Sequence, residues 1–538
     1  MAGDKPVILG IDLGTTNTCV AYVRNKVPRM VPSDKGSLTI PSVVALDPKG
    51  GVIIGNPAKD QMILNPKDSI WGAKRLIGRK FNSRVVQDIK TYFSYDIVEG
   101  REGDAAVMLG GKIHSLPQIS AMLLAHVKTV AETYLEQKVE QAVITVPAYY
   151  NDNQRHAVKE AGRLAGFDVR RIVNEPTAAA LAYGFNRGFD QKILVYDLGG
   201  GTFDVSVLQL HGNVFEVLAT GGDTFLGGVD FDNRVIDYVL EEFKRETKIE
   251  LAQSPIAMQR VKNAAESAKI DLSLLSNVIV ELPYITEDRR GKPQDLRLPL
   301  SRERLNALTQ DLVDRTFAKC DEVLGEKNID PKSISEILLV GGQSRMPLVQ
   351  GKVHAHFGKA ARKGVHPDEC VALGAALLGD SLDSLDSVVL VDALSMPIGI
   401  AVPGGRLRKV LDKNTPIPAA KSFRLPPPKP GEVVRELDIF QGDSEKIVDD
   451  EYLGTLRFDA AMGNERIHFT LDNECLLRVT VDAPGQAERE VVLATRDTPE
   501  SLKKAWADEM EKRRLAHDDE PEKSEGLFSA IRKIWTRA

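Results

Sequence analysis

Two short acidic, glycine-rich segments contain the residues whose types and spacing most clearly imply chemistry. Residues 12–17 read DLGTTN, and residues 197–204 read DLGGGTFD. Glycines let backbone N–H groups approach an anion closely, and threonine hydroxyls add further donors. The aspartates can hold a hydrated divalent cation against phosphates. Two such loops facing each other predict a cleft that clamps a nucleoside triphosphate from both sides.

Each glycine-rich segment lies between two apolar runs, which predict a strand, a tight turn and a second strand. The preceding runs are residues 7–11 and 193–196, and the following ones are 18–22 and 204–208. From about residue 5 to 380, such runs alternate with amphipathic helical stretches, a pattern typical of α/β proteins.

Composition narrows the class of protein. The chain has 538 residues, of which 43% are hydrophobic and 27% charged, as in soluble multidomain proteins. The net charge of −6 argues against a general nucleic-acid binder. The four cysteines form no CxxC pair and favour buried free thiols over a zinc site. Because we find neither a signal peptide nor an apolar run long enough to span a membrane, we expect a cytoplasmic protein.

The character of the sequence changes after residue 380. A polar hinge, 381–387, precedes the apolar run 388–391, and the proline-rich segment 425–431 predicts a stiff loop. Short alternating runs predict a small domain of antiparallel strands at residues 432–440, 455–458, 466–471 and 476–481. We therefore divide the chain into an α/β domain (5–380), a linker (381–392), a β-sandwich domain (393–496) and a short helical C-terminal segment (497–538).

An ordered series of motifs identifies a family resemblance. The motifs are GIDLGTTN (10–17), TIPS (39–42), AKRLIGR (73–79), VITVPAY (143–149), NEPTAAA (174–180), DLGGGTFD (197–204), GDTFLGG (222–228), AKI (268–270), GGQSRMP (341–347) and PDE (367–369). The chain resembles the DnaK-type, seventy-kilodalton heat-shock chaperones, most densely over its first 380 residues. Actin and sugar kinases share the two phosphate loops but not the rest of the series.

The resemblance implies a fold and a cofactor. The fold is an α/β actin-like ATPase domain (a duplicated ribonuclease H-like unit) whose two lobes enclose a deep nucleotide cleft. The cofactors are ATP or ADP with Mg²⁺, and K⁺ as a further ion. Asp12 and Asp197 would hold the Mg²⁺ through its water ligands. The two loops would bind phosphates through Gly14, Thr15, Thr16, Asn17, Gly199, Gly200, Gly201 and Thr202.

The resemblance also assigns catalytic roles. Lys74 would place a positive charge on the γ-phosphate and orient the attacking water. Glu175, Thr202 and Asp204 would complete the shell around that water and the metal. Catalysis of this kind rests on positioning and charge neutralisation. Alternatively, the carboxylates only cap a turn or a helix. This alternative has most weight for Asp204, because aspartate is common after the start of a strand.

The adenosine end of the site is predicted on a helix and a glycine turn. Glu266, Lys269 and Ser273 are spaced to share one helix face. The resemblance places that face against ribose and adenine, whereas without it the residues would suggest a solvated charged face. Ile270 stands where many members of the family have arginine. The base would be lined by Gly341, Gly342, Arg345 and Asp368.

Coupling residues are predicted at Pro147, Arg155 and the linker. Leu390 and Asp392 lie in the segment 388–392, which matches the interdomain linker of the family. An apolar strand between two domains has two states, one buried against the ATPase domain and one not buried there. Such a two-state element is what allostery requires. The alternative is a permanently buried strand of one merged domain.

The β-domain departs from the family pattern. Arg435 stands where the family has an apolar peptide-pocket residue, and Pro403 replaces a usual methionine. A buried arginine needs a partner, and without one it abolishes an apolar pocket. Only about forty residues follow the β-domain, too few for the usual helical lid, so we expect fast client release.

The C-terminal tail carries one apolar helical stripe. Its members are Leu527, Phe528, Ile531, Ile534 and Trp535. Such a stripe packs on the protein's own β-domain, docks on a partner or lies on an anionic membrane surface.

The sequence thus predicts an ATP-dependent chaperone. ATP hydrolysis would control the binding and release of unfolded polypeptide, with a J-domain co-chaperone and a GrpE-like exchange factor as partners. A second hypothesis is a nucleotide-gated scaffold that recruits one partner through the divergent β-domain and tail. A sugar kinase is a third, weaker hypothesis, because the linker and β-domain would have no role in it.

Overall fold

A computed structural model describes residues 6–490, except 34, 363, 365, 383–387, 429, 460–464 and 483–488. It also describes six positions between 502 and 511. Most of the predicted hinge, most of the C-terminal helical segment and the apolar tail stripe therefore lie outside the described residues. Within the described part, no helix combines the length and apolar character needed to cross a membrane.

The first lobe is built on a six-stranded sheet with the order β12-β11-β1-β2-β3, in which β4 also pairs with β2. Its strands are β1 (Ile8–Asp12), β2 (Asn17–Arg24), β3 (Val27–Met30), β4 (Ile40–Pro41), β11 (Gln141–Val146) and β12 (Asp168–Asn174). Two helices pack against this lobe's core, α3 (Leu116–Leu135) and α4 (Asp152–Leu164). Each helix starts with a capping box, at Ser115 and Asn151 respectively.

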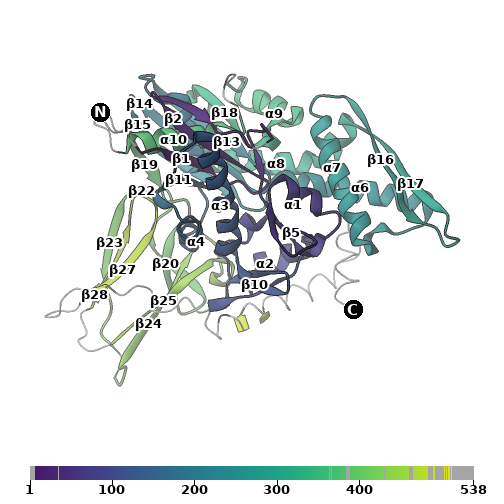
Figure 1. The fold of residues 1–538 in the computed structure, drawn as a ribbon. Helices are drawn as coiled ribbons and strands as arrows, with labels where there is room; N and C mark the ends of the chain where they lie inside the picture. Colours follow the sequence, from purple (N-terminus) through teal and green to yellow (C-terminus); the bar gives the residue numbers. More distant parts are fainter. Residues whose placement is uncertain are drawn as a thin grey trace.

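Two small sheets extend the first lobe, with the orders β6-β5-β7 and β10-β9-β8. Their strands are β5 (Val43–Leu46), β6 (Val52–Ile54), β7 (Ser69–Trp71), β8 (Ile97–Glu99), β9 (Ala105–Leu109) and β10 (Lys112–Ser115). Helices α1 (Asn56–Gln61) and α2 (Arg84–Ile89) belong to the same region (Figure 1).

The second lobe repeats the plan with a sheet of order β18-β13-β14-β15-β19-β22. Its strands are β13 (Asp190–Leu198), β14 (Phe203–His211), β15 (Val214–Asp223), β18 (Glu336–Val340), β19 (Val389–Ala393) and β22 (Pro416–Ile417). Its helices are α6 (Gly228–Thr247), α7 (Pro255–Asp271), α8 (Arg302–Glu326) and α9 (Pro347–Phe357), and the hairpin of β16 (Asn277–Glu287) and β17 (Pro293–Ser301) projects from it (Figure 1).

Helices α5 (Glu175–Gly184) and α10 (Cys370–Ser381) join the two lobes. They pack on each other, and α10 also packs on β1 while α5 contacts β13 and β14. Both helices are rich in alanine and glycine, which lets them approach closely. A side chain at Gly374 would place its Cβ 1.7 Å from the carbonyl oxygen of Ala178.

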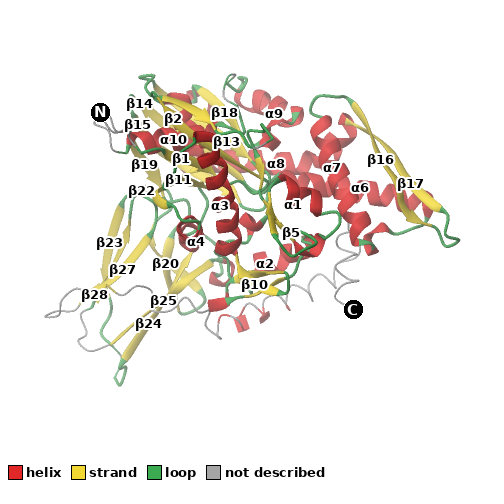
Figure 2. Cartoon of the chain, viewed as in Figure 1, coloured by secondary structure: helices red, strands yellow, loops and turns green. Residues whose placement is uncertain are grey.

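The β-domain consists of two four-stranded antiparallel sheets, with the orders β21-β20-β24-β25 and β23-β26-β27-β28 (Figure 2). Its strands are β20 (Ile398–Val402), β21 (Arg406–Leu411), β23 (Ala419–Arg424), β24 (Val434–Gln441), β25 (Glu451–Asp459), β26 (Arg466–Leu471), β27 (Leu477–Asp482) and β28 (Arg489–Glu490). The four strands predicted from alternation are confirmed, and the described part of 425–431 is irregular, as predicted.

The predicted linker forms strand β19 at the edge of the second lobe. It runs parallel to β15, with Leu390 opposite Phe215. Leu390 packs against the apolar cluster that contains Phe215 and is half-buried, while Val389 stays exposed. Of the two states predicted for the linker, the structure contains the docked one.

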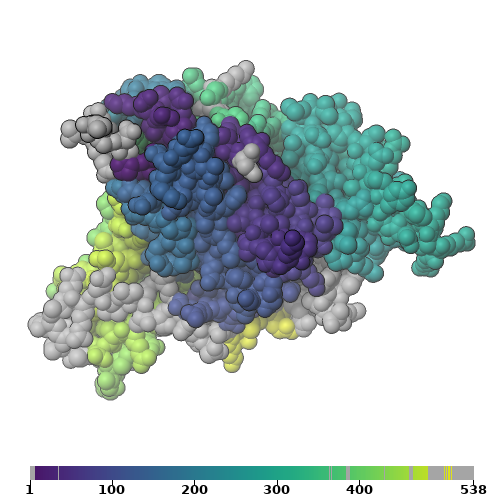
Figure 3. All heavy atoms as spheres, viewed as in Figure 1, coloured from purple at the N-terminus to yellow at the C-terminus, as the bar shows by residue number. Residues whose placement is uncertain are grey.

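The β-domain is docked on both lobes (Figure 3). On the first lobe, the backbone N–H of Asp152 donates to the side chain of Gln441, and its carboxylate accepts from the N–H of Leu477 at 2.7 Å. On the second lobe, the side chain of Asn414 donates to Glu326 at 2.7 Å. Buried backbone groups therefore find their partners across the interface, which ties the domains in one relative position.

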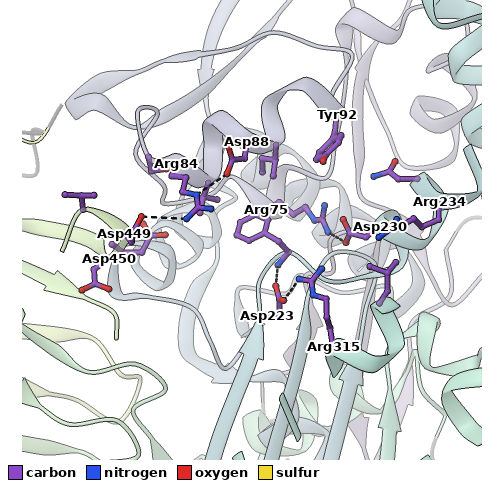
Figure 4. Close-up of a pocket in the computed structure, with 18 of the residues that line it drawn as sticks. Arg75, Arg84, Asp88, Tyr92, Asp223, Asp230, Arg234, Arg315, Asp449 and Asp450 are labelled. Carbon is purple, nitrogen blue, oxygen red and sulfur yellow. Dashed lines mark hydrogen bonds and ion pairs between the residues drawn. The ribbon is translucent and has the colours of Figure 1, made fainter. Parts of the chain in front are cut away.

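A cavity of about 590 Å³ lies where the two lobes and the β-domain meet (Figure 4). Arg84 of the first lobe spans its rim, with Asp88 and Asp449 as partners. Beside the cavity, the buried Arg79 forms an ion pair with Glu451 of the β-domain and donates to Thr224 of the second lobe. One arginine thus connects all three parts.

The helix crossing gives a stability prediction. Gly374→Ala should lower the free energy of unfolding by about 1–3 kcal/mol, because the new methyl group meets backbone atoms that cannot move aside. The control is Gly351→Ala in α9, an exposed helical glycine with no neighbour near its added Cβ. It should raise stability by up to about 1 kcal/mol. Thermal unfolding of the full chain measures both, and equal effects would contradict the packing argument.

A second prediction concerns Asp237, which lines the junction cavity. Burial, reinforced by Glu241, raises the pKa of its carboxyl to about 7, and its Oδ1 has no hydrogen-bond partner in the described chain. Because the folded-state pKa is raised, stability is lost as pH rises from about 4 to 7. Asp237→Asn should therefore stabilise the protein by about 1–2 kcal/mol at pH 8 and by less at pH 5.5.

The matched control for Asp237→Asn is Asp271→Asn, an exposed carboxylate in the same lobe. Denaturant unfolding at the two pH values should show no pH-dependent difference for this control. A stabilisation by Asp237→Asn that does not depend on pH would refute the titration argument.

Candidate functional site

A cavity of about 930 Å³ opens between the two lobes and gathers most of the predicted site residues. The predicted residues that line it are Asp12, Gly14, Thr15, Thr16, Asn17, Lys74, Glu175, Asp197, Gly199, Gly200, Thr202, Glu266, Lys269, Ser273, Gly341, Gly342, Arg345 and Asp368. The topology explains the gathering, because β1 and β13 occupy corresponding positions in the two sheets and each ends at the cleft.

The two glycine loops lie in contact across the cleft. A Cβ added to Gly200 would lie 2.0 Å from the hydroxyl oxygen of Thr16, and one added to Gly201 would lie 2.7 Å from the methyl group of Thr15. Only residues without a side chain permit this approach. The loops therefore present backbone N–H groups from both lobes to one small volume.

Carboxylates concentrate negative charge behind these loops. Burial, and next the charge of Glu175, raise the pKa of Asp12 and of Asp204 to about 7. The same two causes raise the pKa of Asp197 well above its ordinary value. The raised values mean that this volume favours added positive charge.

Lys74 provides a cation within this group. Its ammonium lies 2.5 Å from the carboxylate of Glu175, and both side chains are buried. Burial is the largest single effect and lowers the pKa of Lys74, but the charges of Glu175, Tyr150 and Asp12 together outweigh it, so the pKa lies above the ordinary value. The hydroxyl of Tyr150 donates to the carbonyl of Lys74 at 2.7 Å and fixes the short helical turn, Ala73–Arg75, that carries it.

The donor set fits a hard divalent cation. Carboxylate oxygens are the ligands that Mg²⁺ prefers, and Asp12, Asp197 and Asp204 each favour a cation nearby. Among the described residues, no three carboxylate, histidine or cysteine groups are arranged to hold a metal ion directly.

The far end of the cavity carries the residues predicted for adenosine. Lys269 on α7 donates to the carbonyl of Gly228 at 3.0 Å, and Arg345 pairs with Asp368 at 2.5 Å. Ser273 lies in the turn that directly continues α7 beyond Asp271, and it lines the same cavity as Glu266 and Lys269.

Two predicted phosphate-site residues lie outside the cavity lining. The carbonyl of Gly201 accepts from Arg75 at 2.9 Å, which turns that residue away from the cleft. Asp204 is buried behind the loop and accepts from the backbone N–H of Tyr149 at 3.2 Å. Both support the loops from behind in this structure.

Besides Arg79, sequence reasoning missed two residues that connect the lobes. Arg75 binds Gly201 and also pairs with Asp230 at 2.6 Å, so it latches the first lobe to the loop of the second. Arg75 lies in the motif AKRLIGR, directly after Lys74, so the sequence offered a reason to assign it a role at the cleft. Lys59 pairs with Glu266 at 3.2 Å across the cleft. No local pattern indicates a partner 207 positions away.

The predicted coupling residues lie on the side of the cleft that faces the linker. Arg155 donates to Asn174 at 2.8 Å and to the backbone carbonyl of Ala148, next to Pro147. Asp392 of β19 accepts from the hydroxyl of Thr177 at 3.3 Å. Leu390 is half-buried against the second lobe, as described above.

A model of the Hsp70 protein family matches residues 8–530, which is nearly the whole chain. The match covers both lobes, the linker strand and the β-domain, together with every residue assigned to the cleft. The chain therefore belongs to the Hsp70 family, whose members are ATPases that act as chaperones.

Proposed function

We propose that this protein is an ATP-driven chaperone in which nucleotide in the cleft controls polypeptide binding by the β-domain. One observation carries the coupling. Helix α5 begins with Glu175, which pairs with Lys74 in the cleft, and Thr177, two residues later, binds Asp392 of the linker strand. A shift of the first turn of α5 therefore acts on both the phosphate site and the linker.

In the proposed reaction, the glycine loops bind the phosphates and the lobes close around them. Lys74 is placed to neutralise charge that develops on the transferred phosphoryl group, and Glu175 holds the lysine in position. Thr202 and Asp204 would order the attacking water. Asp12 and Asp197 would hold Mg²⁺ through its water ligands, and the ion would supply positive charge to the phosphate site.

The proposed switch is the docking of β19 and the β-domain. Docking partly buries Leu390 beside β15 and ties Gln441 to Asp152. A change in lobe closure that displaces β15 or α4 weakens both contacts at once. This two-state behaviour supports a division into an actin-like ATPase domain at 5–380, a linker at 381–392, a substrate domain at 393–496 and a reduced lid at 497–538.

The family also suggests the protein's partners. We propose a J-domain protein that stimulates hydrolysis, a GrpE-like factor that exchanges nucleotide, and unfolded polypeptide as the client. K⁺ as a second ion and a location in the cytoplasm remain part of the proposal.

A nucleotide-gated scaffold is the second candidate function. Arg435 favours it, because this arginine is buried in the β-domain and pairs with the equally buried Glu465. A buried ion pair does not provide the apolar pocket that a general chaperone uses for its clients. The scaffold would bind one partner in place of many extended segments.

The catalytic assignment predicts the behaviour of Lys74→Ala. Loss of the ammonium should lower kcat for ATP hydrolysis by about 100-fold or more while ATP affinity changes little. Single-turnover hydrolysis and equilibrium nucleotide binding measure the two effects. The control is Lys80→Ala, which removes a buried lysine that pairs with Asp104 outside the cleft. Normal turnover in the Lys74 variant would refute the assignment.

The chaperone proposal predicts nucleotide-dependent peptide binding and linker protection. Exchange of ADP for ATP should change peptide affinity about tenfold or more and alter protease cleavage near Leu390. Asp392→Asn should uncouple the two readouts, because it weakens the contact with Thr177. If no peptide on a broad array binds, while protease cleavage near Leu390 still depends on nucleotide, the result would instead support the scaffold.

A further inference from the structure

The β-domain presents two sheet edges that carry only positive charge. Strand β21 is the outer strand of one sheet and β23 the outer strand of the other. An outer strand leaves one row of backbone N–H and C=O groups open to pairing with another chain. Their charged residues are Arg406, Arg408, Lys409, Lys421 and Arg424, with no acidic residue on either strand.

The two edges lie beside each other. The guanidinium of Arg408 on β21 lies 5.5 Å from the ring centre of Phe423 on β23. At one end, Lys421 of β23 pairs with Asp412, the residue after β21, at 3.6 Å. A segment paired with either edge would therefore lie close to the charged side chains of the other.

Most of this positive charge is not neutralised within the protein. Lys409 pairs with Asp443 and Lys421 with Asp412. Arg406, Arg408 and Arg424 are exposed, and no carboxylate lies within ion-pair distance of them in the described part of the chain. Three uncompensated arginines on adjoining open edges attract a negatively charged segment.

The core behind these edges disfavours a large apolar client side chain. Arg435 shares the inner face of β24 with Leu437 and Ile439, so it occupies a position that would otherwise extend the apolar core. Its guanidinium donates to the carbonyl of Pro426 at 2.6 Å and pairs with Glu465, which is 1% exposed. The buried Arg435–Glu465 pair, which we call the polar closure of the sandwich, thus takes the place of apolar side chains.

We infer that the β-domain selects extended polypeptide segments rich in aspartate and glutamate, which pair through their backbone with the β21 or the β23 edge and through their side chains with Arg406, Arg408 and Arg424. The inference rests on the proposed function, since it names the client class of that same domain. Backbone pairing supplies affinity without regard to sequence, and the arginines supply the selection.

A rival explanation is that the charges only prevent edge-to-edge aggregation, a common use of basic residues on outer strands. In that role the positive charges repel the same edge of a second protein molecule. It predicts no difference in affinity between acidic and neutral peptides that share the same apolar positions. Peptide charge therefore separates the two explanations.

The test uses the full chain with ADP and three labelled peptides that share their apolar positions and carry Glu, Gln or Lys elsewhere. Fluorescence anisotropy should show the Glu peptide binding about fivefold or more tighter than the Gln peptide, and the Lys peptide weakest. Raising the salt from about 0.1 M to about 1 M, which shortens the Debye length from about 10 Å to about 3 Å, should abolish the difference.

Variants locate the effect. R406Q/R424Q should remove most of the preference for Glu over Gln and leave affinity for the Gln peptide within twofold. The matched control is R457Q on β25, an exposed arginine on the outer strand at the opposite side of the same sheet. It should keep the preference. Far-UV circular dichroism and thermal unfolding establish that each variant is folded.

The outcomes are distinguishable. Equal or tighter binding of the Gln or Lys peptide, or a full preference for Glu in R406Q/R424Q, overturns this inference and leaves the proposed chaperone function standing. Failure of all three peptides to bind at any nucleotide state overturns both. A preference lost in R406Q/R424Q and kept in R457Q supports the inference.

Discussion

Excess buried negative charge at the base of the cleft is the constraint on which the rest of the structure depends. Asp12, Asp197, Asp204 and Glu175 share one buried ammonium, that of Lys74, and the pKa of each of the three aspartates is raised. Closing the lobes further without added positive charge would bury these carboxylates more completely at a cost. A hydrated cation with bound phosphates removes that cost, so lobe closure and ligand binding are linked.

The linkage reaches the surface by a short route because α5 is rigid and closely packed. Its first residue, Glu175, feels the charge in the cleft, and its third, Thr177, holds the linker strand through Asp392. Alanines and glycines let α5 and α10 approach closely, so their crossing is tightly packed. A small shift at the phosphates is therefore passed on as movement of the helix.

Local sequence patterns predicted the features that are formed by residues close together in the sequence. The glycine loops, the flanking strands and the β-domain strands all follow from spacing and alternation within a few residues. Contacts that join distant segments did not follow from such patterns: Lys59 meets Glu266, Arg79 meets Glu451, and Arg75 reaches the Gly201 carbonyl.

Strand β24 shows how a divergent client site can coexist with retained coupling. Gln441 at its end accepts from the backbone of Asp152 and so belongs to the docking interface. Arg435, six residues earlier and about 20 Å away along an extended strand, belongs to the polar closure. A strand transmits displacement along its length whatever side chains lie at its far end. The chemistry at Arg435 can therefore change while the contact at Gln441 still reports the state of the cleft.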